Sequence, residues 1–168
     1  MKKIAILVET SYQDLEVWYP FLRLKEEGFD VLAVGTGSAK EYKGKHGYPI
    51  VVDKDIDDAK VQQFDAVLIP GGFAPDYLRR YPKVVEFVRA MHKAGKVVAA
   101  ICHGGWLLAS AEIVGGKTVT SFFAIKDDLV HAGAKFVDQE VAVDGNIITS
   151  RKPEDLPAFV KAIIKALK

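Results

Sequence analysis

The segment at residues 97–111 constrains what this chain can fold into more than any other. It begins with VVAAI, a continuous apolar run typical of a strand buried on both faces of a parallel sheet. CHGG interrupts the run at residues 102–105, and the apolar segment that follows can form a helix. A strand, a one-residue turn and a helix make up the layout of a nucleophile elbow, here with Cys102 at the turn.

Cys102 has two interpretations. A lone cysteine after an apolar strand is most often a small buried side chain, kept for packing. The elbow is favoured here because Cys102 falls at the carboxyl end of its strand, where open α/β sheets bind ligands. A histidine and two glycines follow it, and packing alone does not require them. Because a helix N-terminus favours the thiolate, we predict a pKa below that of free cysteine.

Length and composition limit the class of protein. The 168 residues predict a single domain, 1–168. A net charge of +1, with Lys and Arg scattered rather than clustered, gives no support for a nucleic-acid partner. No apolar run approaches the roughly 18 residues of a membrane span, and the stretch before Glu9 is too short for a signal peptide. The single cysteine excludes an internal disulfide, which agrees with a cytoplasmic protein.

Strand-like and helix-like apolar patterns alternate along the chain. This alternation predicts an α/β fold: a flavodoxin-like, doubly wound, mostly parallel sheet with helices on both faces. Pro20 predicts a kink or a restart in the first helix, and residues 73–76 are expected to form a loop. The expected strands are 3–8, 29–34, 48–52, 64–69, 97–101 and 118–121, with a hairpin at 141–149. The expected helices are 15–27, 84–94, 106–111, 124–132 and 153–168.

Three loops are expected at one edge of such a sheet: the loop after the first strand, PGG at 70–72, and the elbow. Glu16 lies just inside the helix expected after the first of them. Its apolar neighbours would raise its pKa by desolvation, and it could then donate a hydrogen bond to the Cys102 sulfur. Alternatively, Glu16 is a solvated carboxylate, favoured in a first helical turn by the helix dipole. Both interpretations stay open at this point.

His103 is the candidate base beside Cys102. Neighbours in sequence rarely face each other, so catalysis would need a third group to orient the imidazole.

His46 falls in a loop, and His92 and His131 are expected at exposed positions on helices. Four dispersed histidines and one cysteine have the wrong spacing for a zinc site, and no phosphate-binding glycine motif is present. We therefore expect neither a metal nor another cofactor.

Short motifs along nearly the whole chain carry a family resemblance. They are DLE (14–16), RLKEEG (23–28), GKHG (44–47), FDA (64–66), PGG (70–72), APD (74–76), AICHG (100–104), DQEV (138–141), TSR (149–151) and PEDL (153–156). Each is weak alone, but together and in this order they are specific. The chain resembles the PfpI-like intracellular proteases, relatives of the parkinsonism-associated deglycase within the class I glutamine amidotransferase-like superfamily.

The resemblance implies a role for each motif residue. Cys102 is expected to be the nucleophile, with His103 as its catalytic partner and Glu16 as the carboxylate that contacts the sulfur. Asp76 is expected to be the acidic member of the triad, contributed by a neighbouring subunit. Backbone amides near Gly72 and His103 would form the oxyanion hole. The resemblance also implies a homo-oligomer, either a dimer or a hexamer built as a trimer of dimers.

The chain departs from the family pattern beside the elbow. Gly105 and Trp106 stand where relatives usually have Pro-Gln, and Phe122 replaces a pocket tyrosine. Gln13 stands where an acidic residue usually precedes Asp14. Trp106 either packs on the elbow helix or narrows the pocket. The predicted substrate pocket consists of Gly71, Gly104, Trp106, Phe122 and Lys45.

Three functions are carried forward. The leading one is a cysteine-dependent hydrolase of the intracellular protease and deglycase type, acting on peptides or on glycated or aldehyde adducts. The second is a cofactor-independent glyoxalase that converts methylglyoxal into lactate with the same thiol and acid–base pair. The third is a non-enzymatic redox-sensing stress protein or chaperone, in which Cys102 oxidises and Glu16 stabilises the sulfinate. His103 and Asp76 favour catalysis, because a sensor needs neither.

An apolar cluster beside Asp76 is the expected contact surface of the oligomer. It consists of Phe73, Tyr77, Leu78 and Tyr81. If exposed, it would bring Asp76 to a neighbouring subunit. Alternatively, the cluster packs on its own domain and Asp76 caps the following turn.

Overall fold

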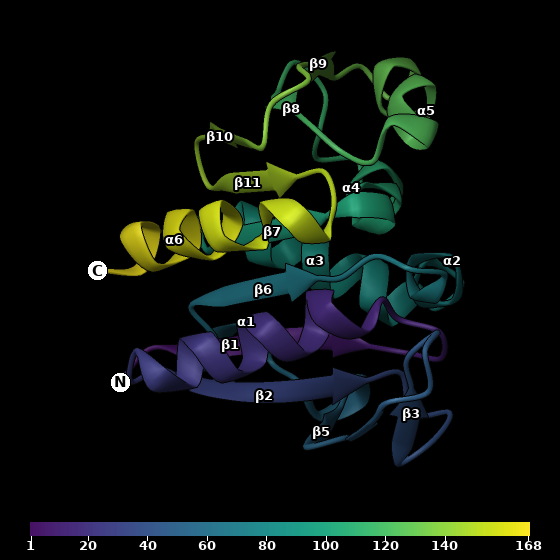
Figure 1. Cartoon of the computed structure of the whole chain (residues 1–168), viewed down its shortest axis with the longest axis vertical. Coiled ribbons are helices and arrows are strands. Elements are labelled where there is room, and N and C mark those ends of the chain that lie inside the picture. The colour runs from purple at the N-terminus through teal and green to yellow at the C-terminus, as the bar shows by residue number, and fades with distance from the viewer.

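A seven-stranded sheet forms the centre of the computed structural model, which describes residues 1–168. Its order is β10-β11-β7-β6-β1-β2-β5, and only β10 runs antiparallel to its neighbour. The strands are β1 (Lys3–Val8), β2 (Asp30–Gly35), β5 (Lys54–Asp55), β6 (Ala66–Ile69), β7 (Val97–Ile101), β10 (Val141–Asp144) and β11 (Ile147–Ser150). Strands β2, β6 and β11 point to the right in Figure 1. Because the other strands except β10 run parallel to them, the carboxyl ends form one edge, while both termini lie on the opposite side. The predicted sheet is confirmed.

Helices cover both faces of this sheet. In Figure 1, α1 and α6 lie in front of the sheet and α3 lies behind it. The short helices α2 and α4 lie at the carboxyl edge, and α5 lies beyond β11. The helices are α1 (Asp14–Glu26), α2 (Ala74–Arg79), α3 (Pro82–Lys93), α4 (Gly105–Ser110), α5 (Lys126–His131) and α6 (Leu156–Leu167). Single 3₁₀ turns occur at Ile56–Asp58, Val61–Gln63, Cys102–Gly104, Phe123–Ile125 and Pro153–Asp155.

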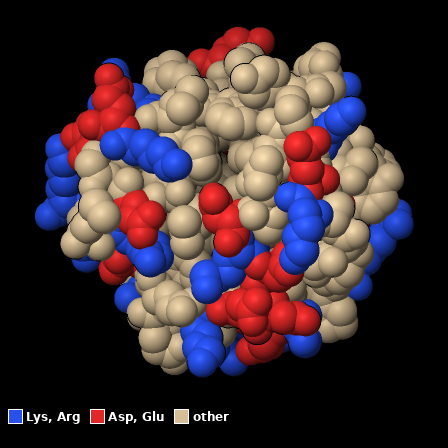
Figure 2. All heavy atoms as spheres, turned by 90° about the horizontal axis from the view of Figure 1, so that it is seen from below, with Lys and Arg blue, Asp and Glu red and all other residues tan.

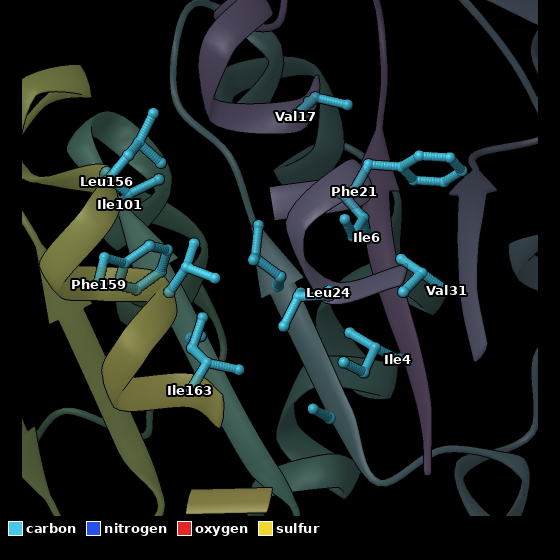
Figure 3. Close-up of a cluster of buried hydrophobic side chains, with 14 of the residues drawn as sticks. Ile4, Ile6, Val17, Phe21, Leu24, Val31, Ile101, Leu156, Phe159 and Ile163 are labelled. Carbon is cyan, nitrogen blue, oxygen red and sulfur yellow. The ribbon is translucent and has the colours of Figure 1, made fainter. Parts of the chain in front are cut away.

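Two hydrophobic clusters lie on the two faces of the sheet. Strand β1 contributes side chains to both clusters: Ile4 and Ile6 belong to one, and Ala5 and Leu7 belong to the other. This is the period-two alternation of a strand with two buried faces. Figure 3 shows the first cluster, in which side chains of α1 and α6 meet the sheet, Phe159 of α6 among them. Burying such a side chain contributes about 1.5–3 kcal/mol, so these contacts hold both helices onto the sheet.

Two short strand pairs lie outside the main sheet. In the antiparallel hairpin of β3 (Glu41–Lys43) and β4 (Pro49–Val51), β4 corresponds to the strand expected at 48–52, whereas β3 is not among the expected strands. The strand expected at 118–121 is shorter: β8 (Thr118–Val119) pairs only with β9 (Lys135–Phe136). Neither β9 nor β5 was expected, because two residues are too few to show an alternating pattern.

Two further expectations need correction. The restart expected at Pro20 is wrong, because α1 runs without interruption from Asp14 to Glu26, with Pro20 buried inside it. The loop expected at 73–76 is also wrong, because α2 begins at Ala74. Pro75 lies in the first turn of α2, where the missing N–H of proline costs no helical hydrogen bond. The hairpin at 141–149 is confirmed, with Gly145 in the left-handed region at the turn.

The surface mixes charges of both signs. The face seen from below, beneath β2 and β5, carries acidic and basic side chains next to one another (Figure 2). Lys83 pairs with Asp57 at 2.7 Å and Lys40 pairs with Asp55. Each exposed pair contributes at most about 1 kcal/mol, so their main effect is to balance charge locally. None of the helices has the length and apolar character needed to cross a bilayer.

Candidate active site

The backbone at Cys102 has the geometry of a nucleophile elbow. Strand β7 ends at Ile101, Cys102 adopts a φ of 60°, and a 3₁₀ turn leads directly into α4. The left-handed region is unfavourable for a residue with a side chain, at a cost of about 1–3 kcal/mol, and such strain is concentrated at functional sites. Gly104 lets the turn approach β6, because a Cβ there would lie 2.7 Å from the carbonyl oxygen of Ile69. The predicted elbow is confirmed.

Glycines of the PGG loop bring the three predicted loops together. A Cβ on Gly71 would lie 2.5 Å from Glu16 Oε2 and 3.0 Å from Cys102 Sγ. The residue before α1, Gln13, donates its backbone N–H to the Gly71 carbonyl at 3.1 Å. Gly72 has a φ of 74° and sits directly against the loop after β1. Since any side chain at Gly71 would push Glu16 and Cys102 apart, the loop must be glycine for these groups to meet.

Glu16 is fully buried beside the elbow. Its Oε2 accepts the backbone N–H of Gly71 at 2.7 Å, while its buried Oε1 has no hydrogen-bond partner in the chain. Burial raises the pKa of Glu16 to about 7, against the opposing effects of Gly71 and Cys102. The solvated interpretation of Glu16 is therefore wrong. A carboxyl group that keeps its proton near neutral pH can donate a hydrogen bond to sulfur.

Cys102 is almost completely buried, and its pKa moves opposite to the prediction. Burial, and after it the nearby Glu16 carboxylate, raise the pKa of the thiol to about 12, against the lowering effect of the backbone amides of His103 and Gly72. The expectation of a lowered pKa is wrong, because α4 has only six residues and its N-terminus does not outweigh desolvation. When Glu16 is protonated, it no longer carries the negative charge that raises the pKa of Cys102. The thiol then depends on a neighbouring base to lose its proton.

His103 is placed to be that base. Its Nδ1 lies 3.3 Å from Cys102 Sγ, even though the two residues are adjacent in sequence. Burial lowers the pKa of His103, and the positive charge of Lys45 lowers it further. The imidazole is therefore neutral at neutral pH, with one ring nitrogen free to accept a proton. The elbow turn thus makes the contact that sequence spacing alone does not guarantee.

Asp76 does not reach His103 within the chain. It lies on α2, where its carboxylate pairs with Arg80 one helical turn later. The apolar cluster expected beside it is only partly exposed. Leu78 is completely buried in the core, whereas Phe73 keeps 49% of its surface exposed and packs edge-on against Tyr77. The expectation of Leu78 as a contact residue is wrong, because α2 is a helix and turns this side chain inward.

Lys45 lies close enough to the site for its charge to act on it. It lies in the turn between β3 and β4, and its charge lowers the pKa values of both His103 and Glu16. Asp14 shapes this turn, a role that the sequence analysis missed. Its carboxylate accepts the backbone N–H groups of His46 at 3.0 Å and Tyr48 at 3.1 Å. The DLE motif at 14–16 was the feature of the sequence that pointed to a role for Asp14.

The other predicted pocket residues have different roles. Gly71 and Gly104 allow close backbone packing. Phe122 stacks on His103 and also borders a cavity of about 540 Å³. The remaining cavity residues were not predicted: Ser121, Phe123, Lys126, Phe136, Asp138, Arg151 and Lys152. No three His, Cys, Asp or Glu side chains gather as possible metal ligands.

The whole chain matches one protein family. Residues 2–166 fit the sequence profile of the DJ-1/PfpI family. The chain belongs to the DJ-1/PfpI family. The resemblance inferred from the motifs is therefore confirmed, and the family explains why the elbow, the start of α1 at 14–16 and the loop at 70–72 occur together.

Relatives and a solved structure agree with this membership. The chain is 43% identical over 166 residues to the deglycase PfpI of Pyrococcus furiosus, covering 99% of both chains. It is 43% identical over 167 residues to YraA of Bacillus subtilis, named as a candidate cysteine protease, again covering 99% of both. A crystal structure from Anabaena variabilis, with DJ-1/ThiJ/PfpI-like and ferritin-like domains, superimposes with a TM-score of 0.97 at 44% identity. The match covers 99% of this chain and 48% of that two-domain chain. The prediction of a peptidase or deglycase agrees with the names of these relatives.

Proposed function

We propose that this protein is a cysteine-dependent hydrolase of the protease and deglycase type, with Cys102 as nucleophile and His103 as base. The observation that carries the proposal is the 3.3 Å contact between Cys102 Sγ and His103 Nδ1 on a strained elbow. The deglycase and cysteine protease names of its relatives support the same class of reaction. The substrates would be peptides or glycated or aldehyde adducts.

In the first step, the Cys102 thiol transfers its proton to His103 Nδ1 as sulfur attacks the substrate carbonyl carbon. The new C–S bond leaves a negative oxygen, for which the backbone N–H groups of Gly72 and His103 are the donors at hand. A protonated Glu16 donates a hydrogen bond to the Cys102 sulfur while the sulfur carries negative charge. The imidazolium of His103 then protonates the leaving nitrogen as the C–N bond breaks, and water hydrolyses the remaining thioester.

We also propose that the site is completed by a second copy of the chain, in a dimer or a hexamer. In this arrangement Asp76 of one subunit would accept a hydrogen bond from the free ring nitrogen of His103 in another. Asp76 forms no hydrogen bond with His103 within the chain, and Phe73 exposes apolar surface near it in sequence, which supports this proposal. A cytoplasmic location is proposed as well, supported by a lone cysteine without a disulfide.

The test of the activity is a turnover panel on peptides, glycated amino acids and methylglyoxal, comparing wild type with Cys102→Ser. Release of a free amino acid or peptide supports the hydrolase, whereas conversion of methylglyoxal into lactate alone would support the glyoxalase. A protein without turnover on any of the three, whose Cys102 oxidises readily, would point to the non-enzymatic role.

The test of subunit sharing mixes two inactive variants, Cys102→Ser and Asp76→Ala, under conditions that exchange subunits. Mixed interfaces can pair an intact Cys102 and His103 from one chain with an intact Asp76 from the other. Partial recovery of turnover supports a shared site. No recovery despite demonstrated subunit exchange would mean that each subunit works alone.

A further inference from the structure

Two aromatic rings enclose the His103 imidazole within one chain. Phe122 stacks on it with ring centroids 5.1 Å apart and an interplanar angle of 29°. Trp106 meets it edge-on at 5.1 Å and 70°. The Phe122 backbone N–H also donates to the Cys102 carbonyl at 3.3 Å, which ties this ring to the elbow itself. The imidazole is therefore confined between two side chains that lie on different segments.

Trp106 is itself held in place from two sides. Its indole Nε1–H donates to Asp128 Oδ2 of α5 at 2.8 Å. The guanidinium of Arg79 lies over the indole ring at 5.6 Å, and Arg79 Nε donates to Ser110 Oγ of α4 at 2.9 Å. The hydrogen bond to Asp128 and the cation over the ring face together fix the orientation of the indole.

We propose that Trp106 and Phe122 form an aromatic clamp that holds His103 Nδ1 toward the Cys102 sulfur, and that Asp128 is the positioning residue that fixes Trp106. The clamp rests on the proposed role of His103 as base. It sets the plane of the imidazole before any second subunit arrives. An acidic group from a neighbouring chain would then act only on the other ring nitrogen.

Charged groups lie around the clamp and the imidazole. Lys45 approaches from the turn between β3 and β4, and Glu16 and Cys102 lie on the sulfur side. Arg79 lies over the face of the indole ring, and Asp128 accepts the indole N–H. Removing the ring of Trp106 would therefore admit water to His103 and change both its orientation and its titration.

The first test uses tryptophan fluorescence and needs no substrate. The protein has two tryptophans, so Trp18→Phe, on α1 and outside the site, leaves Trp106 as the only one. Protonation of an imidazole in contact with an indole quenches its emission. We expect a step in Trp106 emission below about pH 6.5, the ordinary pKa of histidine, and no such step after His103→Gln. The same titration in both proteins would overturn the contact.

The second test measures positioning through alkylation of Cys102 by iodoacetamide, again without substrate. We expect Asp128→Ala to slow the reaction near neutral pH by about tenfold, because a misplaced general base loses much of its effect. Asp128→Asn should recover most of the rate, since its amide oxygen still accepts the indole N–H. Trp106→Phe keeps a ring but loses the N–H, and should match Asp128→Ala.

The decisive control repeats Asp128→Ala in a His103→Gln background. If Asp128 acts through His103, the second substitution has no further effect on the alkylation rate. An equal loss in both backgrounds, or no loss in either, would overturn the clamp. Circular dichroism checks folding, and if Asp128→Ala does not fold, the same cycle with Trp106→Phe decides. A failed substrate panel would not change these outcomes, and a failed clamp would leave turnover dependent on Cys102 intact.

Discussion

Replacing Glu16 by glutamine tests whether ionisation of the buried Glu16 carboxyl group destabilises the folded protein. Glutamine has nearly the same shape and keeps an oxygen to accept the Gly71 N–H, but it cannot ionise. The neighbouring Cys102 keeps its proton at the pH values of the experiment, because burial raises its pKa. The substitution therefore removes one buried ionisable group and changes little else in the site.

The size of the effect follows from the pKa. Burial raises the pKa of Glu16 from its ordinary 4.5 to about 7, so the folded protein binds this proton more tightly than the unfolded chain. The contribution favours folding at low pH, below the unfolded pKa of about 4.5, and is lost as pH rises through about 7. At about 1.4 kcal/mol per pKa unit, the full loss from low to high pH is about 3.5 kcal/mol. Glu16→Gln should therefore be the more stable protein above neutral pH.

Urea unfolding of both proteins at about pH 5, 6.5 and 8 measures this difference. We expect the stability gained by Glu16→Gln to increase over this range by roughly 2–3 kcal/mol. Glu41→Gln is the matched control, because Glu41 is an exposed carboxylate on β3 without an ion pair, and its effect should not change with pH. A difference between wild type and Glu16→Gln that is the same at all three pH values would refute the reasoning.

Three further outcomes follow from the structure. Phe159→Ala should lower the free energy of unfolding by about 3–5 kcal/mol in urea, because it leaves a cavity between α6 and the sheet; a loss below about 1 kcal/mol would contradict the packing. Asp14→Ala should speed amide hydrogen exchange at His46 and Tyr48, both bonded to its carboxylate, and unchanged exchange would disprove that role. Peroxide should convert Cys102 to sulfinate less readily in Glu16→Gln than in wild type, and equal oxidation by mass spectrometry would remove Glu16 from the stabilisation of oxidised sulfur.

The parts of the site set by topology could be predicted from the sequence. An apolar strand followed by CHGG predicts the elbow, and parallel strands bring their following loops to one edge. This placed Glu16, the PGG loop and Cys102 together correctly. The contact between Cys102 and His103 also follows once the elbow turn is known.

The parts set by burial and long-range packing could not be predicted. The pKa of Cys102 depends on how tightly Gly71 lets Glu16 approach the sulfur, across 55 residues of sequence from Glu16 to Gly71. A pattern of residue types does not show that, at Cys102, desolvation raises the pKa more than the N-terminus of a short helix lowers it. The bond from Trp106 to Asp128 joins positions 22 residues apart with no shared motif. The helix at Ala74–Arg79 had one usable signal, Pro75 in its first turn.

The most direct measurement of the central claim is mass spectrometry of an acid-quenched reaction with a substrate from the panel. Because Cys102 is the only cysteine, a covalent acyl or hemithioacetal intermediate can form on one thiol alone. We predict an adduct on the peptide containing Cys102 that appears and decays at the rate of product formation, and its absence in Cys102→Ser together with loss of turnover. Turnover that persists in Cys102→Ser, or an adduct on any other residue, would contradict the account.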